Sequence, residues 1–263
     1  MTRKMLLLGA LVLLTPALLF AGTTCATPTI VPSDGRVVDF DFVAPIGANF
    51  YQFSVTKGSS YSVEVRQDYD DVNTDLTVTA STDCVPTALT GTTDTTSVEP
   101  ALPSNSTRFS FTAAASGVVI VKVSNANAST GRYVSVSASE TTQYNVRWST
   151  FSGFVTQWGF QNTTSATIHA SLTATTVLSG NGAGSGSSTV NFTVNPNSQV
   201  FLIIGNNAAF AFNVGANKAG FAVLTSDGPP GALLTDAFFL GGTTSPVIVP
   251  SVFQPVRQGH TGR

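Results

Sequence analysis

The sequence predicts an all-β fold: two antiparallel β-sandwich domains, of the jelly-roll or immunoglobulin-like type, that follow an N-terminal signal peptide. Short segments along the chain alternate between apolar and polar residues, which is the period of a half-buried strand. Gly, Pro, Asn, Asp and Ser separate these segments, and no segment has a helical period. The 263 residues are enough for two β domains of roughly 100 to 120 residues each.

The first residues follow the pattern of a secretory signal. Arg3 and Lys4 precede an apolar run over residues 5–20, so residues 1–21 are predicted to be a signal peptide. Pro16 interrupts a run that is already shorter than the ~20 residues of a spanning helix, which favours cleavage over a permanent anchor. No later apolar run has that length. The mature chain is therefore expected to be secreted or at the cell surface, without membrane insertion.

The composition narrows the class of partner. Charged residues make up 10% of the chain, against about 25% in typical globular proteins, and the formal net charge is only −2. No block of like charges is present, so the chain lacks the electrostatic surface of a nucleic-acid or anionic-membrane binder. The predicted surface consists largely of Ser, Thr, Asn and Gly, as in exported β domains.

The two cysteines, Cys25 and Cys84, are predicted to form a disulfide, because an exported protein enters an oxidising compartment. The bond would close a long loop and contribute about 4 kcal/mol to stability in the chain-entropy model. The alternative is lipid modification of Cys25. That alternative is disfavoured because Gly22, Thr23 and Thr24 do not form the Leu-small-small sequence that resembles a bacterial lipobox.

Seven alternating segments predict the strands of a first domain over residues 25–140. They are residues 37–43, 50–55, 61–65, 76–80, 109–113, 119–123 and 133–138. A linker is predicted at residues 141–154, a second domain at residues 155–256 and a disordered tail at residues 257–263. Strands of the second domain are expected at residues 155–160, 168–177, 190–194, 200–204, 221–225 and 233–240.

Pieces of the first half occur in a characteristic order: FYQFSV at 50–55, GSSYSVEV at 58–65, DLTV at 75–78, RFSFTA at 108–113, SG at 116–117 before VKV at 121–123, and GRYVSV at 131–136. Together they resemble the bacterial pre-peptidase C-terminal (PPC-like) domain over about residues 37–139. The resemblance implies a small antiparallel sandwich that serves exported enzymes as a non-catalytic accessory module. Val118 and Val119 depart from the aromatic pair that this family usually has after the glycine.

The second half carries QWGFQNT at 157–163, DGPPGA at 227–232 and VPSVFQP at 249–255, together with Trp148. Over residues 145–256 it resembles an uncharacterised C-terminal β module of exported bacterial proteins. The glycine-rich stretch at residues 179–187 is interpreted as a hairpin tip. A phosphate loop would need a helix N-terminus after it, and here a strand is predicted to follow.

An acidic segment before the strand at 76–80 is the candidate metal site. Its five oxygen-bearing side chains are Asp68, Asp70, Asp71, Asn73 and Asp75. Calcium prefers such ligands, but the spacing is not that of an EF-hand, because Asn73 occupies the position of the invariant Gly. Two interpretations stay open: a solvated acidic turn, or a weak calcium site with calcium as the sole candidate cofactor.

The sequence lacks a recognisable catalytic set. The only histidines are His169, in an alternating strand, and His260, in the predicted tail. They offer no zinc-ligand spacing, and the chain is not expected to be an enzyme.

Aromatic residues crowd the start of the second domain. Trp158 and Phe160 share one strand face and are predicted to lie in the core. Trp148, Phe151 and Phe154 fall in the predicted linker, where they are candidate ligand-binding residues or could seal the interface between the domains.

These observations predict an exported, non-catalytic protein that binds extracellular material, either a polysaccharide or a protein surface. The alternative is a structural component of a surface layer, fibre or matrix, because low charge and open sheet edges favour self-assembly.

Overall fold

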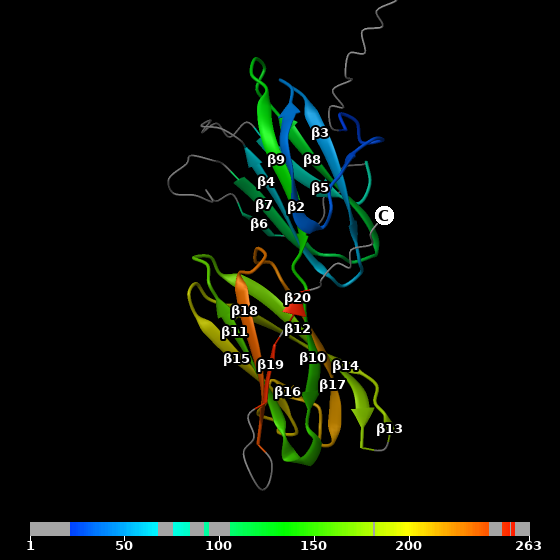
Figure 1. Ribbon diagram of the computed structural model, residues 1–263, viewed down its shortest axis with the longest axis vertical. Helices are drawn as coiled ribbons and strands as arrows, with labels where there is room; N and C mark the ends of the chain where they lie inside the picture. The colour runs from blue at the N-terminus through cyan, green and yellow to red at the C-terminus, as the bar shows by residue number, and fades with distance from the viewer. Residues whose placement is uncertain are drawn as a thin grey trace, which may run out of the picture.

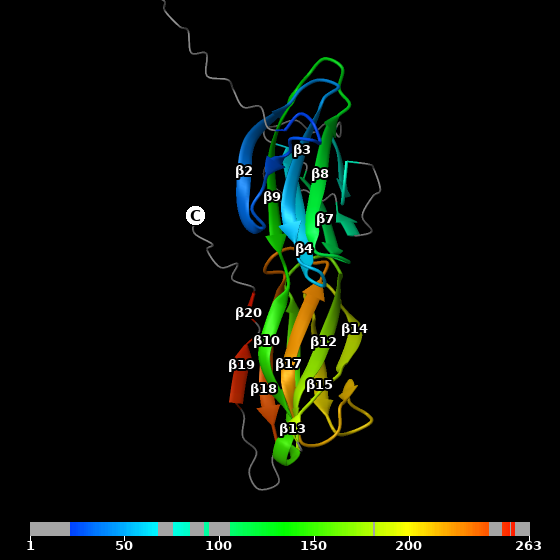
Figure 2. The ribbon, with the colours of Figure 1, turned by 90° about the vertical axis from the view of Figure 1, so that its right-hand side faces the viewer.

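The computed structural model describes residues 22–67, 76–84, 92–94, 106–180, 182–241, 249–252 and 254–255. Within these ranges the chain is all-β, with several sheets, one 3₁₀ turn (η1, Phe151–Gly153) and no α-helix. The described part therefore contains no helix that could span a membrane. The strands form an N-terminal pair of sheets and a C-terminal pair of sheets, which lie end to end along the long axis (Figures 1 and 2).

The N-terminal sheet pair contains β1 (Thr29–Ile30), β2 (Asp34–Val43), β3 (Ala48–Val55), β4 (Ser60–Gln67), β5 (Leu76–Ser81), β6 (Thr92–Asp94), β7 (Ser106–Thr112), β8 (Gly117–Asn125) and β9 (Arg132–Glu140). Among the described residues, one sheet has the order β1-β3-β8-β5 and the other has the order β2-β9-β4-β7-β6. All pairings in this half are antiparallel except that of β1 with β3.

The C-terminal sheet pair contains β10 (Gln143–Ser149), β11 (Val155–Asn162), β12 (Ile168–Ser179), β13 (Gly182–Ala183), β14 (Ser187–Val194), β15 (Gln199–Gly205), β16 (Phe212–Asn213), β17 (Lys218–Ser226), β18 (Leu233–Leu240), β19 (Val249–Val252) and β20 (Gln254–Pro255). In the described chain, the six-stranded sheet runs β13-β12-β17-β10-β20, with β14 also paired to β12. The five-stranded sheet runs β16-β15-β11-β18-β19, and its β15–β16 pair is parallel.

The N-terminal core lies between alternating side chains of both sheets. Tyr51 and Phe53 of β3 and Tyr61 and Phe111 of the opposite sheet are buried in one cluster. The Tyr51 hydroxyl donates a hydrogen bond to Asp41 of β2. Burial, together with this bond, raises the pKa of the Tyr51 phenol above its ordinary value.

The C-terminal core is built in the same way around two fully buried tryptophans. Trp158 of β11 and Trp148 of β10 come from opposite sheets, and the Trp158 ring meets Phe212 edge to face at 5.6 Å between centroids. Phe160 is also fully buried, which confirms the prediction that Trp158 and Phe160 are core residues. Each half thus has its own apolar cluster.

All thirteen strands predicted from alternation are present in the structure. The predicted linker at residues 141–154 requires correction. Gln143–Ser149 forms β10, which pairs with β17 and β20 inside the six-stranded sheet, so the C-terminal sheets begin before residue 155. The expectation of purely antiparallel sheets is also too simple, because two short pairs are parallel. Residues 1–21 and 257–263 lie outside the described residues.

The predicted disulfide is confirmed. Cys25 and Cys84 are bonded, with 5.6 Å between their Cα atoms and a sequence separation of 59. The bond joins the segment before β1 to the segment after β5. Because such a bond persists in an oxidising environment, it is consistent with a location outside the cytoplasm.

A hydrogen-bonded junction connects the two sheet pairs, and the buried Ser60 at the start of β4 lies at its centre. The Ser60 amide donates to Thr142 Oγ1 at 2.9 Å, and the Ser60 carbonyl accepts from the Thr141 amide at 2.8 Å. Its hydroxyl accepts from Thr141 Oγ1 at 2.8 Å and from the amide of Ser226, the last residue of β17, at 3.4 Å. The connection at residues 141–142 is therefore short and fixed by both halves.

Candidate binding site

The outward side of the six-stranded sheet carries mostly hydroxyl and amide side chains. On β12 and β17 the inward residues, such as Leu172 and Leu224, are buried in the core, so their sequence neighbours face outward. Figure 2 shows strands β10, β17, β12 and β14 side by side. Their register places their outward residues beside one another. We call this set the polar face: Ser187, Thr189, Asn191 and Thr193; His169, Ser171, Thr173 and Thr175; Phe221, Val223 and Thr225; and Tyr144.

The polar face has the chemistry of a neutral, hydrogen-bonding surface. Thr173 and Thr189 lie opposite each other on β12 and β14, and their Oγ1 atoms are hydrogen-bonded at 2.9 Å. Phe221 and Tyr144, with 37% and 36% of their surface exposed, flank Val223. None of the residues in this set is Lys, Arg, Asp or Glu. At about 3.3 Å per residue, the face extends for roughly 20 Å along β12.

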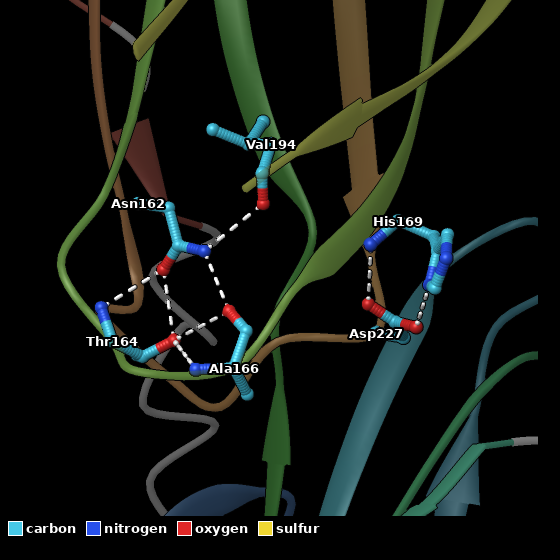
Figure 3. Close-up of polar contacts among 6 residues, drawn as sticks. All are labelled: Asn162, Thr164, Ala166, His169, Val194 and Asp227. Carbon is cyan, nitrogen blue, oxygen red and sulfur yellow. Dashed lines mark hydrogen bonds and ion pairs between the residues drawn. The ribbon is translucent and has the colours of Figure 1, made fainter. Parts of the chain in front are cut away.

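A His–Asp pair closes one end of the polar face (Figure 3). Asp227 follows β17, and its two carboxylate oxygens accept from the His169 backbone amide at 2.8 Å and interact with His169 Nδ1 at 2.9 Å. The Asp227 amide donates back to the His169 carbonyl at 3.1 Å. These contacts hold the largely exposed imidazole in place. When Nδ1 donates to the carboxylate, the neutral ring presents Nε2 as an acceptor.

A cleft of about 430 Å³ opens beside this pair, at the junction of the two sheet pairs. One wall is the end of β7 at residues 110–112, and the other walls are residues 169–171, 191–193 and 225–227 of the C-terminal half. Its volume is in the range of small-molecule and cofactor sites. Because both halves line it, the cleft depends on the fixed junction around Ser60.

Ser110 is the one lining residue whose buried polar atom lacks a protein partner in the described part of the chain. Only 2% of the surface of Ser110 is exposed, and its Oγ neither donates nor accepts a hydrogen bond within the described chain. Buried hydroxyls in native proteins are usually hydrogen-bonded, and those that are not call for an explanation such as a functional role. Ser110 Oγ is therefore an unpaired hydroxyl oxygen buried in the wall of the cleft.

Asn162 holds the same end of the C-terminal half together (Figure 3). It is fully buried at the end of β11, and its Nδ2 donates to the Ala166 carbonyl at 2.7 Å and to the Val194 carbonyl at 3.0 Å. Its Oδ1 accepts from the amide and hydroxyl of Thr164, both at 2.8 Å. The β11–β12 loop and the end of β14 are thus fixed beside the cleft.

The aromatic candidates from the sequence do not form a binding platform. Trp148 is fully buried, and its Nε1 donates to the Phe221 carbonyl at 3.0 Å, so it supports the polar face from inside the core. This corrects its predicted role as a ligand-binding residue. Phe151 and Phe154 are half-buried around η1. The neighbouring Thr150 is hydrogen-bonded to Lys218, the first residue of β17, whereas the junction lies at Ser226, the last residue of β17. These aromatics therefore lie far from the junction and do not seal the interface between the halves.

The candidate calcium ligands Asp68, Asp70, Asp71, Asn73 and Asp75 lie outside the described residues. Within the described ranges, no group of three or more His, Cys, Asp or Glu side chains could hold a metal ion. A smaller groove of about 300 Å³ crosses β2, β9 and β4 and includes Asp39 and Glu64. Ser135 donates to Asp39, whereas Glu64 Oε1 accepts no hydrogen bond in the described chain and forms only a 3.8 Å ion pair with Arg66.

Sequence reasoning missed the polar face and the cleft for an identifiable reason. His169 was recognised as a sheet residue, but Asp227 is 58 positions away and its role depends on β12 and β17 being neighbours. The hydroxyl pattern of residues 169–175 and 187–193 was visible as alternation. These two segments form one continuous polar surface only because the two strands pair with each other and direct their polar side chains to the same face of the sheet.

Comparison with known proteins gives no family assignment: no protein-family model matches the chain, and no curated protein matches it. The resemblance of residues 37–139 to the pre-peptidase C-terminal domain therefore stays a prediction.

Proposed function

We propose that this chain is an exported, non-catalytic protein that binds a neutral extracellular polysaccharide along the polar face and in the adjoining cleft. The observation that carries the proposal is the polar face itself, a surface of hydroxyl and amide groups on three neighbouring strands with Phe221 and Tyr144 at its side. Sugars offer hydroxyl groups to such donors and acceptors, and apolar ring faces to aromatic side chains.

The electrostatics favour a neutral ligand over a charged one. His169 and Asp227 lie together at one end of the polar face and are partners of each other. The rest of the face has no side chain that carries a charge at neutral pH. Arg147 of β10, exposed at the bulge opposite Phe221, is a cation at the margin of this face. The hydroxyl and amide groups that make up the face itself suit a neutral polysaccharide.

The architecture supports the placement outside the cytoplasm. We propose that each sheet pair is one β-sandwich domain and that residues 1–21 are a signal peptide. The Cys25–Cys84 bond and the low content of charged residues support an oxidising, exported environment. Calcium binding by the acidic segment at residues 68–75 remains a separate proposal.

The cleft supports binding better than catalysis. Ser110 Oγ is buried and makes no hydrogen bond to His169 in this structure, so the contact expected between a nucleophile and its base is not formed. The His169–Asp227 pair instead spans two strands and fixes their ends. In this arrangement the largely exposed His169 imidazole offers hydrogen-bonding atoms to a ligand that enters from the polar face, and Ser110 Oγ lies buried in the wall of the cleft.

Affinity electrophoresis of the purified chain in gels that contain a soluble β-glucan, a galactomannan or a dextran tests the proposal. Phe221→Ala should weaken binding about tenfold, which corresponds to ~1.4 kcal/mol. His169→Ala should weaken it by about two- to tenfold, in line with the net value of one hydrogen bond, because the largely exposed His169 imidazole lines the cleft.

Two variants serve as matched controls. Phe201→Ala removes an aromatic ring that is 52% exposed on the other sheet, and Ser54→Ala removes an exposed hydroxyl from β3. Both should keep wild-type affinity. The proposal is wrong if none of the three polysaccharides retards the wild-type chain, or if Phe201→Ala loses as much affinity as Phe221→Ala.

The alternative proposal is a structural protein that assembles through its sheet edges. It is favoured by one specific feature, the open edge of β14, which does not depend on polysaccharide binding.

A further inference from the structure

Strand β14 forms an edge of the six-stranded sheet. Its eight residues pair with β12 on one side, and no described strand pairs with the other side (Figure 2). Only Val194, at its end, is buried. The edge is therefore accessible along most of the strand.

The backbone groups on the open side can be assigned from the hydrogen bonds of β12. The Thr176 amide bonds toward β14, to the Gly186 carbonyl, whereas the His169 carbonyl accepts from Asp227, after β17. Successive residues of a strand direct their amide and carbonyl groups to opposite sides. Even-numbered residues of β12 therefore bond to β14, through partners such as Val190 and Phe192.

The residues between those partners direct their amide and carbonyl groups to the open side of β14. They are Ser187, Thr189, Asn191 and Thr193. None of them has an assigned backbone partner on that side in the described chain. An edge of this kind is a template for another strand.

The usual protections of an edge strand are missing from β14. Natural edges carry Lys or other charges, Pro or a bulge, which prevent pairing with another chain. The sequence of β14 is SSTVNFTV, and its pairing with β12 is regular over all eight residues. A strand without charge does not repel a second copy of itself.

We propose that β14 pairs antiparallel with β14 of a second copy of this chain, about a two-fold axis at Asn191. This register sets Asn191 against Asn191 of the second copy and Thr189 against Thr193, and all of them have free backbone groups on that side. On the inner face of the sheet this register places Val190 opposite Phe192 of the second copy, so two apolar side chains are in contact. A two-fold axis at Val190 would instead place Phe192 opposite the polar Ser188, which makes that register less favourable.

This pairing gives a closed dimer in which the polar faces of the two copies lie on the same side of one sheet. A two-fold pair uses the same edge of both chains, so no open β14 edge remains for a third copy. The six-stranded sheets become one continuous sheet. Because the strands run antiparallel, the N-terminal sheets of the two copies extend in opposite directions.

Two measurements on the purified full chain test the pairing. Sedimentation equilibrium should show a reversible dimer, and Asn191→Lys should weaken the dimer at least tenfold because it sets two ammonium groups against each other at the axis. Asn191→Cys should form a disulfide-linked dimer under mild oxidation, because Cα atoms about 5.5 Å apart are within disulfide range. The two natural cysteines are already bonded to each other.

Gln161 is the matched control position, because it is exposed on β11, an inner strand of the other sheet. Gln161→Lys should leave the dimer intact, and Gln161→Cys should stay monomeric under the same oxidation. A wild-type chain that stays monomeric up to millimolar concentration overturns the proposal. The proposal is also overturned if the chain forms open-ended polymers. It is overturned as well if Asn191→Cys forms cross-linked dimers no faster than Gln161→Cys does.

Discussion

At the scale of single residues, buried polar side chains hold both halves of the molecule in shape. Asn125 at the end of β8 and Asn162 at the end of β11 have equivalent roles, since each amide group donates to several backbone carbonyls in or beside the adjoining loops. Each side-chain oxygen then accepts from a backbone amide two residues later. A buried Asn with these bonds fixes the loop that follows its strand, because any other loop conformation would leave polar atoms unpaired.

Tyr51 supports a prediction at this scale. Tyr51→Phe should lower the free energy of unfolding at neutral pH by about 1 to 3 kcal/mol, because the Asp41 oxygen that accepts from Tyr51 then keeps only the bond from Asn49. Urea unfolding of both proteins measures this difference. Tyr133→Phe, at an exposed ring, is the matched control and should cost less than about 0.5 kcal/mol.

The same residue predicts a pH dependence. The pKa of Tyr51 is raised in the folded chain, so above about pH 10 the unfolded chain releases the phenol proton while the folded chain keeps it. The free energy of unfolding must then fall as pH rises, by up to ~1.4 kcal/mol per pH unit for this one group. Tyr51→Phe removes that part of the slope. Equal slopes for wild type and variant between pH 9.5 and 11 would show that the raised pKa is wrong.

At the scale of elements, the junction around Ser60 determines whether the cleft keeps its shape. Ser60→Ala removes the hydroxyl that accepts from Thr141 Oγ1 and from the Ser226 amide. We expect a loss of about 1 to 3 kcal/mol in unfolding free energy, together with faster limited proteolysis between residues 140 and 143. Ser54→Ala, at an exposed position on β3, should change neither quantity. A Ser60→Ala chain with unchanged proteolysis would contradict the coupling.

The elements also show what sequence patterns can and cannot predict. The alternation of apolar and polar residues predicted β11 and β12 correctly, because one face of each strand is buried. The same alternation placed Trp158 and Phe160 on the buried face, and both lie in the core. Strand β10 was missed because it is bulged between Asn145 and Trp148, which breaks the period of two. Trp148 therefore looked like a linker residue.

The binding site was less predictable than the strands for a related reason. A strand is defined by local periodicity, but the polar face exists only because β14, β12 and β17 are neighbours in a particular register. The cleft additionally needs β7, from the other half of the chain. The Cys25–Cys84 bond was predictable because the chain has only two cysteines and an export pattern.

At the scale of the whole molecule, the two halves are arranged so that the cleft lies at one end of the polar face, beside His169 and Asp227. A ligand chain that follows β12 and β14 would end between the His169–Asp227 pair and Ser110. Pairing of β14 between two copies would place two such faces on one sheet. Polysaccharide binding and dimer formation remain separable through Phe221, which belongs to the polar face and lies on β17, away from the β14 edge. Asn191 belongs to both proposals, because it lies on the two-fold axis and also lines the cleft.

Hydrogen–deuterium exchange of the intact chain, with and without a bound neutral polysaccharide, tests the central claim most directly. The account predicts slower exchange in β12, β14 and β17 and at residues 110–112, with the five-stranded C-terminal sheet unchanged. Slower exchange confined to other strands, or unchanged exchange throughout the chain at saturating polysaccharide, would contradict it.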